Sequence, residues 1–599
     1  MCGIVGYIGE LKATDVILSG LEKLEYRGYD SCGISFLNND NNRFITYKDK
    51  GRVDHLINSF DYRMDNHLGI GHTRWATHGA PNTINSHPHA SISERFIVVH
   101  NGVIDNYQEL TARYLEGVRL ISETDTEVIV NMIELFSKTM SVEEAIRKTL
   151  SLLEGSYALL IIDSKNQNNM YAAKNKSPLL IGKSSKGVTF ASDLMALVGN
   201  SDLYYLIEDK TFVIANNLTG KFDFIAYDII GKEILLEEHQ MNLTDSVIDK
   251  AGYEHFMLKE ISEQPTVIRK IIANYTVNNN LEINESIRKM FDNIKRVYII
   301  AAGTSMHAGF VGKHYFEKIT NLPCEVFIAS EFAYNPPLLE EKAVFIFISQ
   351  SGETADLRAC LVNVKKMGYP CLTITNVITS TLAREANGAM EIFAGPEIAV
   401  ASTKAYVGQV TILAILAYCL AKRKDFNLSY ELSKVSVAME TLLDKKDYIE
   451  KLVHRKLTKR NCFYIGRGID YYTCLEAALK LKEISYIQTE GFAAGELKHG
   501  TIALIEENVP VIAIISQKHI NNNTRSNIQE VRARGANTLI IASENISQPT
   551  DDIILDDTHY LLTPLITVVP TQLIAYYKAK ELNLDIDKPR NLAKSVTVE

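Results

Sequence analysis

Runs of apolar residues divide the chain into two halves with different patterns. In the first half, short apolar runs of the kind that form strands recur at 3–8, 44–47, 96–99, 157–162, 170–173 and 211–215. Apolar residues at helical spacing predict helices over 16–26, ended by Gly28, and over 125–136. We therefore expect residues 1–240 to form a β-rich α/β domain.

Beyond residue 240 the pattern changes. A polar stretch predicts a linker over 241–284, and apolar strands then alternate with longer helices, as in a parallel sheet wound with helices. VYIIAAGTSMHAG (297–309) resembles CFYIGRGIDYYT (462–473), because each leads from an apolar strand through a small-residue turn into a helix. We predict two copies of one α/β domain, with an extended tail behind them, at 285–425, 455–590 and 591–599.

Composition and charge narrow the class of protein. The 599 residues are 46% hydrophobic and 23% charged, which is more apolar material than one core can use. The net charge is −9 without long blocks of one sign, so we expect no nucleic-acid partner. The apolar run 407–420 is too short to span a bilayer and contains Gln409. It predicts a buried helix, and we expect no association with a membrane.

The cysteines and histidines bear on compartment and cofactors. Eight cysteines are scattered without metal-ligand spacing, and the first residues lack the basic flank and long apolar core of a signal peptide. We therefore expect a cytoplasmic protein. The histidines lack carboxylate or thiolate companions at ligand spacing, so we expect neither a metal nor another cofactor. These histidines are His72, His78, His87, His89 and His100.

Cys2 follows the initiator methionine directly. Removal of Met1 would leave an amine with a pKa near ~7.8 and a thiol near ~8.5 on the same residue. The amine could then act as general base for its own nucleophile. A buried cysteine that happens to fall second explains this position equally well when it is taken alone.

Three polar motifs of the first half change that balance: GHTRWATHG (71–79), HNG (100–102) and SETDTE (122–127). An amide hydrolase needs a cation for the carboxylate of its substrate, an anion for the amino group, and donors for the tetrahedral oxyanion. Arg74 and Asp125 are the charged candidates. The Asn101 side chain and the Gly102 backbone are candidate oxyanion donors.

Together with MCGIVGYIG and YRGYDS (26–31), these motifs resemble the glutaminase domain of the N-terminal-nucleophile amidotransferases. The resemblance implies a four-layer αββα sandwich and a γ-glutamyl thioester on Cys2. It assigns glutamine recognition to Arg74, His87 and Asp125, the oxyanion hole to Asn101 and Gly102, and an ammonia gate to Trp75.

Hydroxyl and amide side chains follow two apolar strands of the second half. Ser349, Gln350, Ser351 and Thr354 come between a strand and a helix, and Thr304 and Ser305 do so after the preceding strand. Backbone N–H groups at a helix start, surrounded by such side chains, make a neutral phosphate cradle. Since both strand ends meet one edge of a parallel sheet, we expect a phosphorylated ligand there.

Lys480 and Glu483, three residues apart, fall on one side of a predicted helix, as an acid–base pair could. These features resemble the sugar isomerase domain, which implies two doubly wound α/β domains. The order of domains resembles that of enzymes that aminate fructose 6-phosphate with glutamine and isomerise the product to glucosamine 6-phosphate. That resemblance implies a homodimer in which Glu483 moves hydrogen between C1 and C2 with help from Lys480. It assigns ring opening to His499, an imine to Lys594, and the phosphate to Thr304, Ser305, Ser349, Gln350, Ser351 and Thr354.

Three positions depart from the common pattern of these enzymes, Cys32, Ala302 and Thr501, and none replaces a reacting group.

Two alternative functions find less support in the sequence. A phosphoribosyl acceptor site would need a small-residue loop after IILDDT (553–558), but His559 and Tyr560 follow. A sugar-sensing regulator would need a helix-turn-helix segment, and none is predicted.

Overall fold

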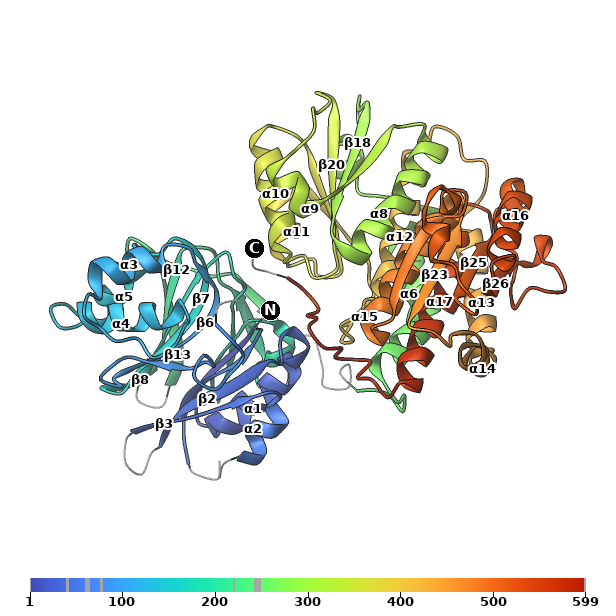
Figure 1. Cartoon of the computed structure of the whole chain (residues 1–599). Helices are drawn as coiled ribbons and strands as arrows, with labels where there is room; N and C mark the ends of the chain where they lie inside the picture. The colour runs from blue at the N-terminus through green and yellow to red at the C-terminus, as the bar shows by residue number, and fades with distance from the viewer. Residues whose placement is uncertain are drawn as a thin grey trace. The chain divides into compact units, whose positions relative to one another are not determined.

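The computed structural model describes residues 2–38, 43–59, 65–75, 79–218, 221–241 and 249–596. The chain divides into a first unit, Met1–Asp249 with Ala593–Glu599, and a second unit, Lys250–Leu592 (Figure 1). Met1, His78, the first part of the expected linker and the last three residues of the tail lie outside the described residues.

Two antiparallel sheets form the centre of the first unit (Figure 1). The eight-stranded sheet has the order β15-β11-β9-β10-β1-β4-β2-β3, and the seven-stranded sheet has the order β14-β13-β12-β8-β7-β6-β5. The strands of the first sheet are β1 (Gly3–Gly9), β2 (Ser31–Asn38), β3 (Arg43–Lys50), β4 (Leu68–Arg74), β9 (Leu180–Ser184), β10 (Gly187–Ala191), β11 (Leu203–Leu206) and β15 (Glu238–Gln240). Those of the second are β5 (His89–Ala90), β6 (Phe96–Ile104), β7 (Gly155–Asp163), β8 (Asn166–Asn175), β12 (Thr211–Leu218), β13 (Lys221–Asp228) and β14 (Glu233–Ile234).

Helices cover the outer faces of both sheets. Along β1 successive side chains point to opposite faces, so Ile4 packs with Leu160 between the sheets, while Val5 packs with Ile17 of the first helix. A third cluster joins the second sheet to its own helices and includes Ile129. The expected αββα sandwich is confirmed. Its helices are α1 (Ala13–Leu24) and α2 (Val53–Ser59) on the first sheet, and α3 (Tyr107–Tyr114), α4 (Thr126–Phe136) and α5 (Val142–Leu150) on the second.

The second unit contains two five-stranded sheets in which every strand pair is parallel. Their orders are β19-β18-β20-β21-β22 and β24-β23-β25-β26-β27. The two orders are the same when each is counted from its first strand, as two copies of one doubly wound domain require. The strands are β18 (Arg296–Ala301), β19 (Cys324–Ile328), β20 (Ala343–Ser349), β21 (Cys371–Thr375), β22 (Gly388–Glu391), β23 (Asn461–Gly466), β24 (Gln488–Ala493), β25 (Pro510–Ile515), β26 (Asn537–Ser543) and β27 (Ile553–Leu555).

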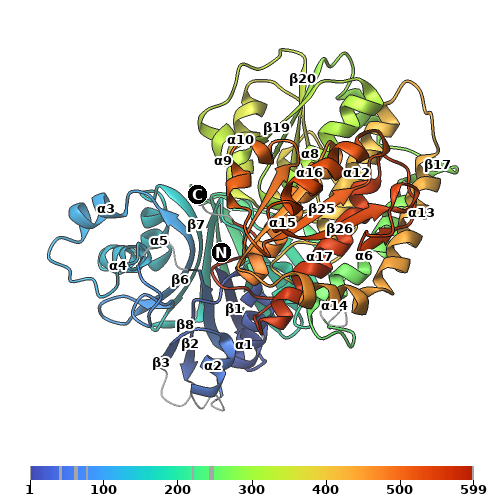
Figure 2. The ribbon, with the colours of Figure 1, turned by 45° about the vertical axis from the view of Figure 1, so that its right-hand side comes forward.

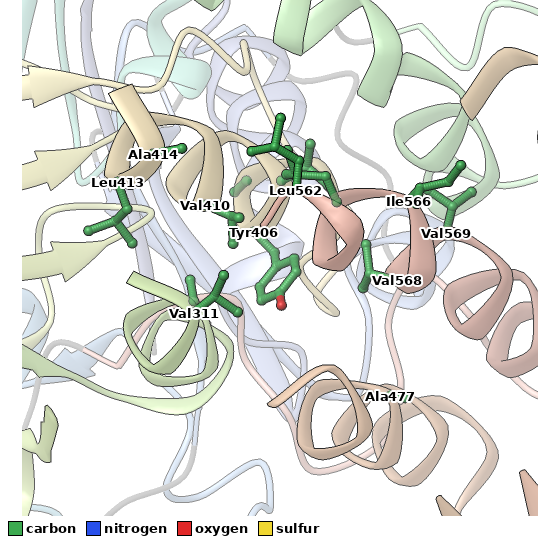
Figure 3. Close-up of a cluster of buried hydrophobic side chains, with 14 of the residues drawn as sticks. Val311, Tyr406, Val410, Leu413, Ala414, Ala477, Leu562, Ile566, Val568 and Val569 are labelled. Carbon is green, nitrogen blue, oxygen red and sulfur yellow. The ribbon is translucent and has the colours of Figure 1, made fainter. Parts of the chain in front are cut away.

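Helices of both copies share one hydrophobic core. Figure 3 shows Val311, Tyr406, Ala477 and Ile566 within it, and Figure 2 places their helices among the two sheets. The helices that contribute to this core include α8 (Gly303–Tyr315), α12 (Lys404–Leu420), α13 (Leu428–Leu443), α14 (Lys446–Lys456), α15 (Ile469–Ser485) and α17 (Thr563–Glu581). Helices α9 (Ala329–Tyr334), α10 (Ala355–Lys366), α11 (Thr381–Glu385) and α16 (Asn521–Arg532) pack in separate clusters. Helix α12 is the buried helix expected over 407–420. In the part of the chain that the structure describes, no helix is long and apolar enough to cross a membrane.

The expected linker is partly wrong, because the 20-residue helix α6 (Phe256–Tyr275) begins inside it. Met257 and Ile261 of this helix are buried in the shared core. Two polar residues of the same stretch, Glu260 and Gln264, are buried as well. Glu260, 2% exposed, accepts hydrogen bonds from the backbone N–H groups of Ile398 and Ala399. The sequence alone does not distinguish a buried glutamate that accepts backbone hydrogen bonds from a glutamate on the surface.

Candidate active sites

Cys2 lies directly before β1, next to the end of β4. The antiparallel pairing of these strands places Gly3 opposite Thr73, so the following residues of β4 reach Cys2. The backbone N–H of Trp75 donates to Cys2 Sγ at 3.2 Å. Burial raises the pKa of the Cys2 thiol, although the Trp75 N–H and Arg74 act in the opposite direction. A thiol that burial keeps protonated needs a base before it can attack.

Asn101, on β6, directs its amide group at Cys2. Its Nδ2 donates to the Cys2 carbonyl oxygen at 2.9 Å. His72 Nε2 lies 3.0 Å from both Asn101 Oδ1 and the His100 carbonyl oxygen. Both of these atoms are acceptors, so Nε2 of His72 carries the proton. This bond fixes Oδ1 toward His72 and leaves the NH₂ group for Cys2. His72 lies within the motif GHTRWATHG, but nothing in that motif indicated this role.

Gly102, the next residue of β6, has a backbone that only glycine fits. Its φ is +142°, and a Cβ atom would lie 2.0 Å from the Ser156 carbonyl oxygen. Any side chain would therefore displace the strand that carries the two expected oxyanion donors.

The two charged candidates of the first unit are buried near Cys2. Arg74 is 3% exposed and donates to the carbonyl oxygens of Gly79 and Ala80 at 3.2 and 3.4 Å. Burial lowers the pKa of Arg74, while Cys2 and the carboxylates of Asp30 and Asp125 act against that shift. Asp125 precedes α4, and its Oδ2 accepts the Ile104 N–H at 2.8 Å. The structure thus brings opposite charges to the surroundings of one thiol.

His87 belongs to a stack of buried histidines. Its ring lies parallel to that of His72, with centroids 4.2 Å apart, and its Nδ1 accepts the His100 N–H at 3.2 Å. Burial holds the pKa of His87 well below its usual value, so the ring is neutral. Among the described residues, no group of three His, Cys, Asp or Glu side chains could hold a metal ion.

The loop between β20 and α10 is lined by hydroxyl groups. Ser349 Oγ and Thr354 Oγ1 are 2.9 Å apart, and the N–H of Gly352 donates to Ser349 Oγ at 3.0 Å. The N–H of Glu353 donates to Ser351 Oγ at 3.2 Å. The structure therefore gathers the candidate phosphate ligands, with Gln350 between them, in one turn at a helix start.

Ser305 and Thr304 begin α8 at the same sheet edge, because β18 and β20 are parallel neighbours. Ser305 Oγ accepts a hydrogen bond from Nε2 of the fully buried Gln409 at 3.0 Å. The Thr304 hydroxyl is instead bonded to residues of the second isomerase-like copy. It accepts from Lys480 Nζ at 2.9 Å and lies 3.2 Å from Glu476 Oε1.

Lys480 and Glu483 form the pair expected on α15. Lys480 is 1% exposed, and its Nζ donates to Glu483 Oε2 at 2.5 Å. Burial alone would lower the pKa of Lys480, but the carboxylates of Glu483 and Glu476 raise it above its usual value. The ammonium group is therefore charged. Glu476, like His72, was missed from the sequence.

His499 and Lys594 belong to other segments of the chain than this pair. His499 ends a short 3-10 turn, Leu497–His499, and is exposed. Lys594 belongs to the first unit, where its N–H donates to the Tyr26 carbonyl oxygen at 3.3 Å. Their roles at a sugar remain predictions.

The second copy has a different arrangement at the equivalent sheet edge. Ser349 ends β20 and Ser516 follows β25, so the two serines lie at equivalent strand ends. Asp470 lies in the first turn of α15, where the first copy has Ser305 in α8. Asp470 Oδ2 accepts the Ser516 N–H at 2.8 Å, and the Ser516 hydroxyl also donates to Asp470. Burial raises the pKa of Asp470 to about 7, although these bonds oppose the shift. The side chain of Asp470 therefore occupies this edge of the second sheet.

Comparisons with known proteins identify the domains that carry the two candidate sites. A family model described as a glutamine amidotransferase domain matches residues 73–199, and one described as an SIS domain matches 290–418 and 457–579. The fold and sites define a glutamine amidotransferase joined to two SIS domains. Curated proteins of Oceanobacillus iheyensis and Bacillus cereus, named glutamine–fructose-6-phosphate aminotransferase [isomerizing], are 52% and 53% identical to the chain over 100% of both lengths. The chain belongs to the family of these isomerizing aminotransferases.

A solved structure agrees with the second unit. The C-terminal domain of glucosamine-fructose-6-phosphate aminotransferase from Francisella tularensis is 36% identical, with a TM-score of 0.55. It covers 57% of this chain, and the match includes 100% of that protein's chain.

Proposed function

We propose that this enzyme transfers the amide nitrogen of L-glutamine to D-fructose 6-phosphate and isomerises the product to D-glucosamine 6-phosphate, releasing L-glutamate. One observation carries the proposal. A half-buried cysteine with oriented amide donors and a hydroxyl cradle with a Lys–Glu pair occur in one chain that matches aminotransferases of this name along its whole length.

In the glutaminase half, Cys2 attacks the carboxamide carbon of glutamine. The α-amine exposed by loss of Met1 takes the thiol proton, since burial disfavours the free thiolate. Asn101 Nδ2 and the Gly102 N–H donate to the oxyanion. The C–N bond then breaks, the amine returns its proton to the leaving ammonia, and water hydrolyses the thioester to glutamate.

Charge complementarity assigns the ends of the glutamine molecule. The Arg74 guanidinium pairs with the α-carboxylate, and the Asp125 carboxylate pairs with the α-ammonium group. We assign His87 to the wall of this site, and Trp75, adjacent to the nucleophile, to the gate through which ammonia leaves.

In the isomerase half, the cradle binds the phosphate through the hydroxyl and amide side chains and the N–H groups at the start of α10. Its residues are Thr304, Ser305, Ser349, Gln350, Ser351 and Thr354. His499 opens the sugar ring, and Lys594 supports the imine at C2. Ammonia replaces the C2 oxygen, which leaves as water. Glu483 then takes a proton from C1 and delivers one to C2, while Lys480 holds its carboxylate in place.

Assaying both half-reactions on two variants tests the function. Cys2→Ala should abolish glutamine hydrolysis and leave sugar isomerisation intact. Glu483→Gln should lower isomerisation by ~10²–10⁴-fold and spare hydrolysis, because it removes a general base. Loss of the same half-reaction in both variants would refute the division of labour. Mass spectrometry that finds Met1 retained in fully active enzyme would refute the amine as base.

We also propose a cytoplasmic homodimer. The eight cysteines are all free, as is usual in a reducing compartment. The exposed side of His499 supports its use at the sugar site of a second copy.

A further inference from the structure

Glu476 is a buried carboxylate to which the proposed mechanism gives no role. It precedes Lys480 by four residues and Glu483 by seven, so the three side chains share one face of α15. Glu476 is 0% exposed, and its Oε1 lies 3.6 Å from Lys480 Nζ. Lys480 therefore lies between two carboxylates, only one of which is assigned to the chemistry.

Helix α8 of the first SIS domain supplies the other partners of Glu476. Thr304 donates from its hydroxyl to Oε1 at 3.2 Å, and His307 Nδ1 lies 2.7 Å from Oε2. A carboxylate accepts hydrogen bonds, so Nδ1 of His307 carries a proton. These two residues are one helical turn apart and face the same group.

The register of α8 against α15 is fixed by a second contact. The rings of Phe310 and Tyr472 stack with centroids 5.4 Å apart, one turn along from His307 and Glu476. The hydroxyl of nearby Tyr406 makes no hydrogen bond with any described residue and lies in the apolar cluster of Figure 3. Among the described residues, the side chain that donates to Glu476 Oε2 is His307.

We propose that His307 is a positioning residue for sugar isomerisation. By donating to Glu476 it satisfies that carboxylate, and Lys480 remains bonded to Glu483. Without this donor, the buried Glu476 draws the ammonium group across the 3.6 Å that separate them and away from Glu483. A residue of the first SIS domain thus sets the geometry of the acid–base pair of the second. The inference rests on the proposed roles of Lys480 and Glu483.

The test compares two substitutions at one position. His307→Leu keeps the bulk and removes the donor, so kcat for isomerisation should fall by ~10-fold or more, as the loss of a hydrogen bond to a charged group does. KM for fructose 6-phosphate should stay within ~2-fold, because four of the six proposed phosphate ligands, Ser349, Gln350, Ser351 and Thr354, lie between the end of β20 and the start of α10 and not on α8. His307→Asn keeps an N–H donor and should recover most of the activity. Glutamine hydrolysis should be unchanged in both variants.

A compensating change separates positioning from general damage. Glu476→Gln removes the charge that competes for Lys480, so His307→Leu combined with Glu476→Gln should be more active than His307→Leu alone. The inference is wrong if His307→Leu isomerises within ~2-fold of the parent, or if His307→Asn and His307→Leu lose activity equally. It is also wrong if the double variant is no more active than His307→Leu alone. A parent enzyme without isomerase activity would instead contradict the proposed function itself.

Discussion

The glutaminase proposal depends directly on the orientation of the Asn101 amide. His72→Phe keeps an aromatic ring that can stack on His87 but removes the Nε2–H that holds Asn101 Oδ1 at 3.0 Å. The amide is then free to turn over. In the turned orientation a carbonyl oxygen, and not an NH₂ group, faces Cys2, and it would repel the oxyanion.

The size of the effect follows from the burial of the site. His72 is 0% and Asn101 5% exposed, so water does not replace the lost bond. An unsatisfied buried acceptor costs about 1–3 kcal/mol, which corresponds to roughly 5- to 150-fold. Complete removal of an oxyanion donor costs about 10²–10³-fold in kcat. Since Asn101 Nδ2 survives in a fraction of molecules, we expect a loss of ~10-fold.

The assay is steady-state glutamine hydrolysis, with fructose 6-phosphate isomerisation measured on the same samples as a check on folding. His89→Phe is the matched control, because His89 is equally buried but its Nε2 contacts Thr124 at 3.2 Å. The loss should also vanish in an Asn101→Ala background. A kcat for His72→Phe within ~2-fold of the parent, or a loss that adds fully to that of Asn101→Ala, would refute the reasoning.

Three further predictions concern the second unit and the tail. The raised pKa of Asp470, about 7 against ~3.9 when unfolded, contributes stability at low pH that is lost as the pH rises through 7. Asp470→Asn should therefore flatten the dependence of Tm on pH between 5 and 8; an unchanged slope contradicts this. If His499 serves a neighbouring subunit, mixing His499→Ala with Glu483→Gln chains should restore some activity, whereas residues acting within one chain give no rescue. Borohydride with fructose 6-phosphate should label Lys594, and mass spectrometry that finds another lysine modified would reassign the imine.

Local patterns in the sequence were enough for much of the fold. The continuous apolar run 3–8 predicted a strand. In the structure Ile4 lies between the two sheets and Val5 lies under a helix, so both faces of this strand are buried, as an unbroken apolar run requires. The similarity of 297–309 to 462–473 likewise anticipated two sheets of one strand order. Helix α6 was not predicted, because Glu260 and Gln264 are polar residues and the sequence does not show that they are buried.

Residues that act through others were harder to find. His72 reaches Asn101 across 29 positions, and His307 reaches Glu476 across 169. No spacing rule connects such pairs, since the contact exists only once strands or domains are packed. The motifs indicated which residues could react. They did not indicate that His72 and His307 orient such residues.

At the sheet edge of the second SIS domain, the side chain of Asp470 lies where the first SIS domain has Ser305. Asp470 and Ser516 bond to each other at the sheet edge where the first copy has its candidate phosphate ligands, so the second copy fills this edge with a side chain of its own. Asp470 also begins α15, the helix whose later turns carry Lys480 and Glu483. The bond to Ser516 therefore ties the start of α15 to the end of β25, so the helix with the proposed acid–base pair is attached directly to its own sheet. Two copies of one fold thus use the same sheet edge differently: the first lines it with the hydroxyl groups proposed to bind phosphate, and the second uses it to fix the helix that carries Lys480 and Glu483.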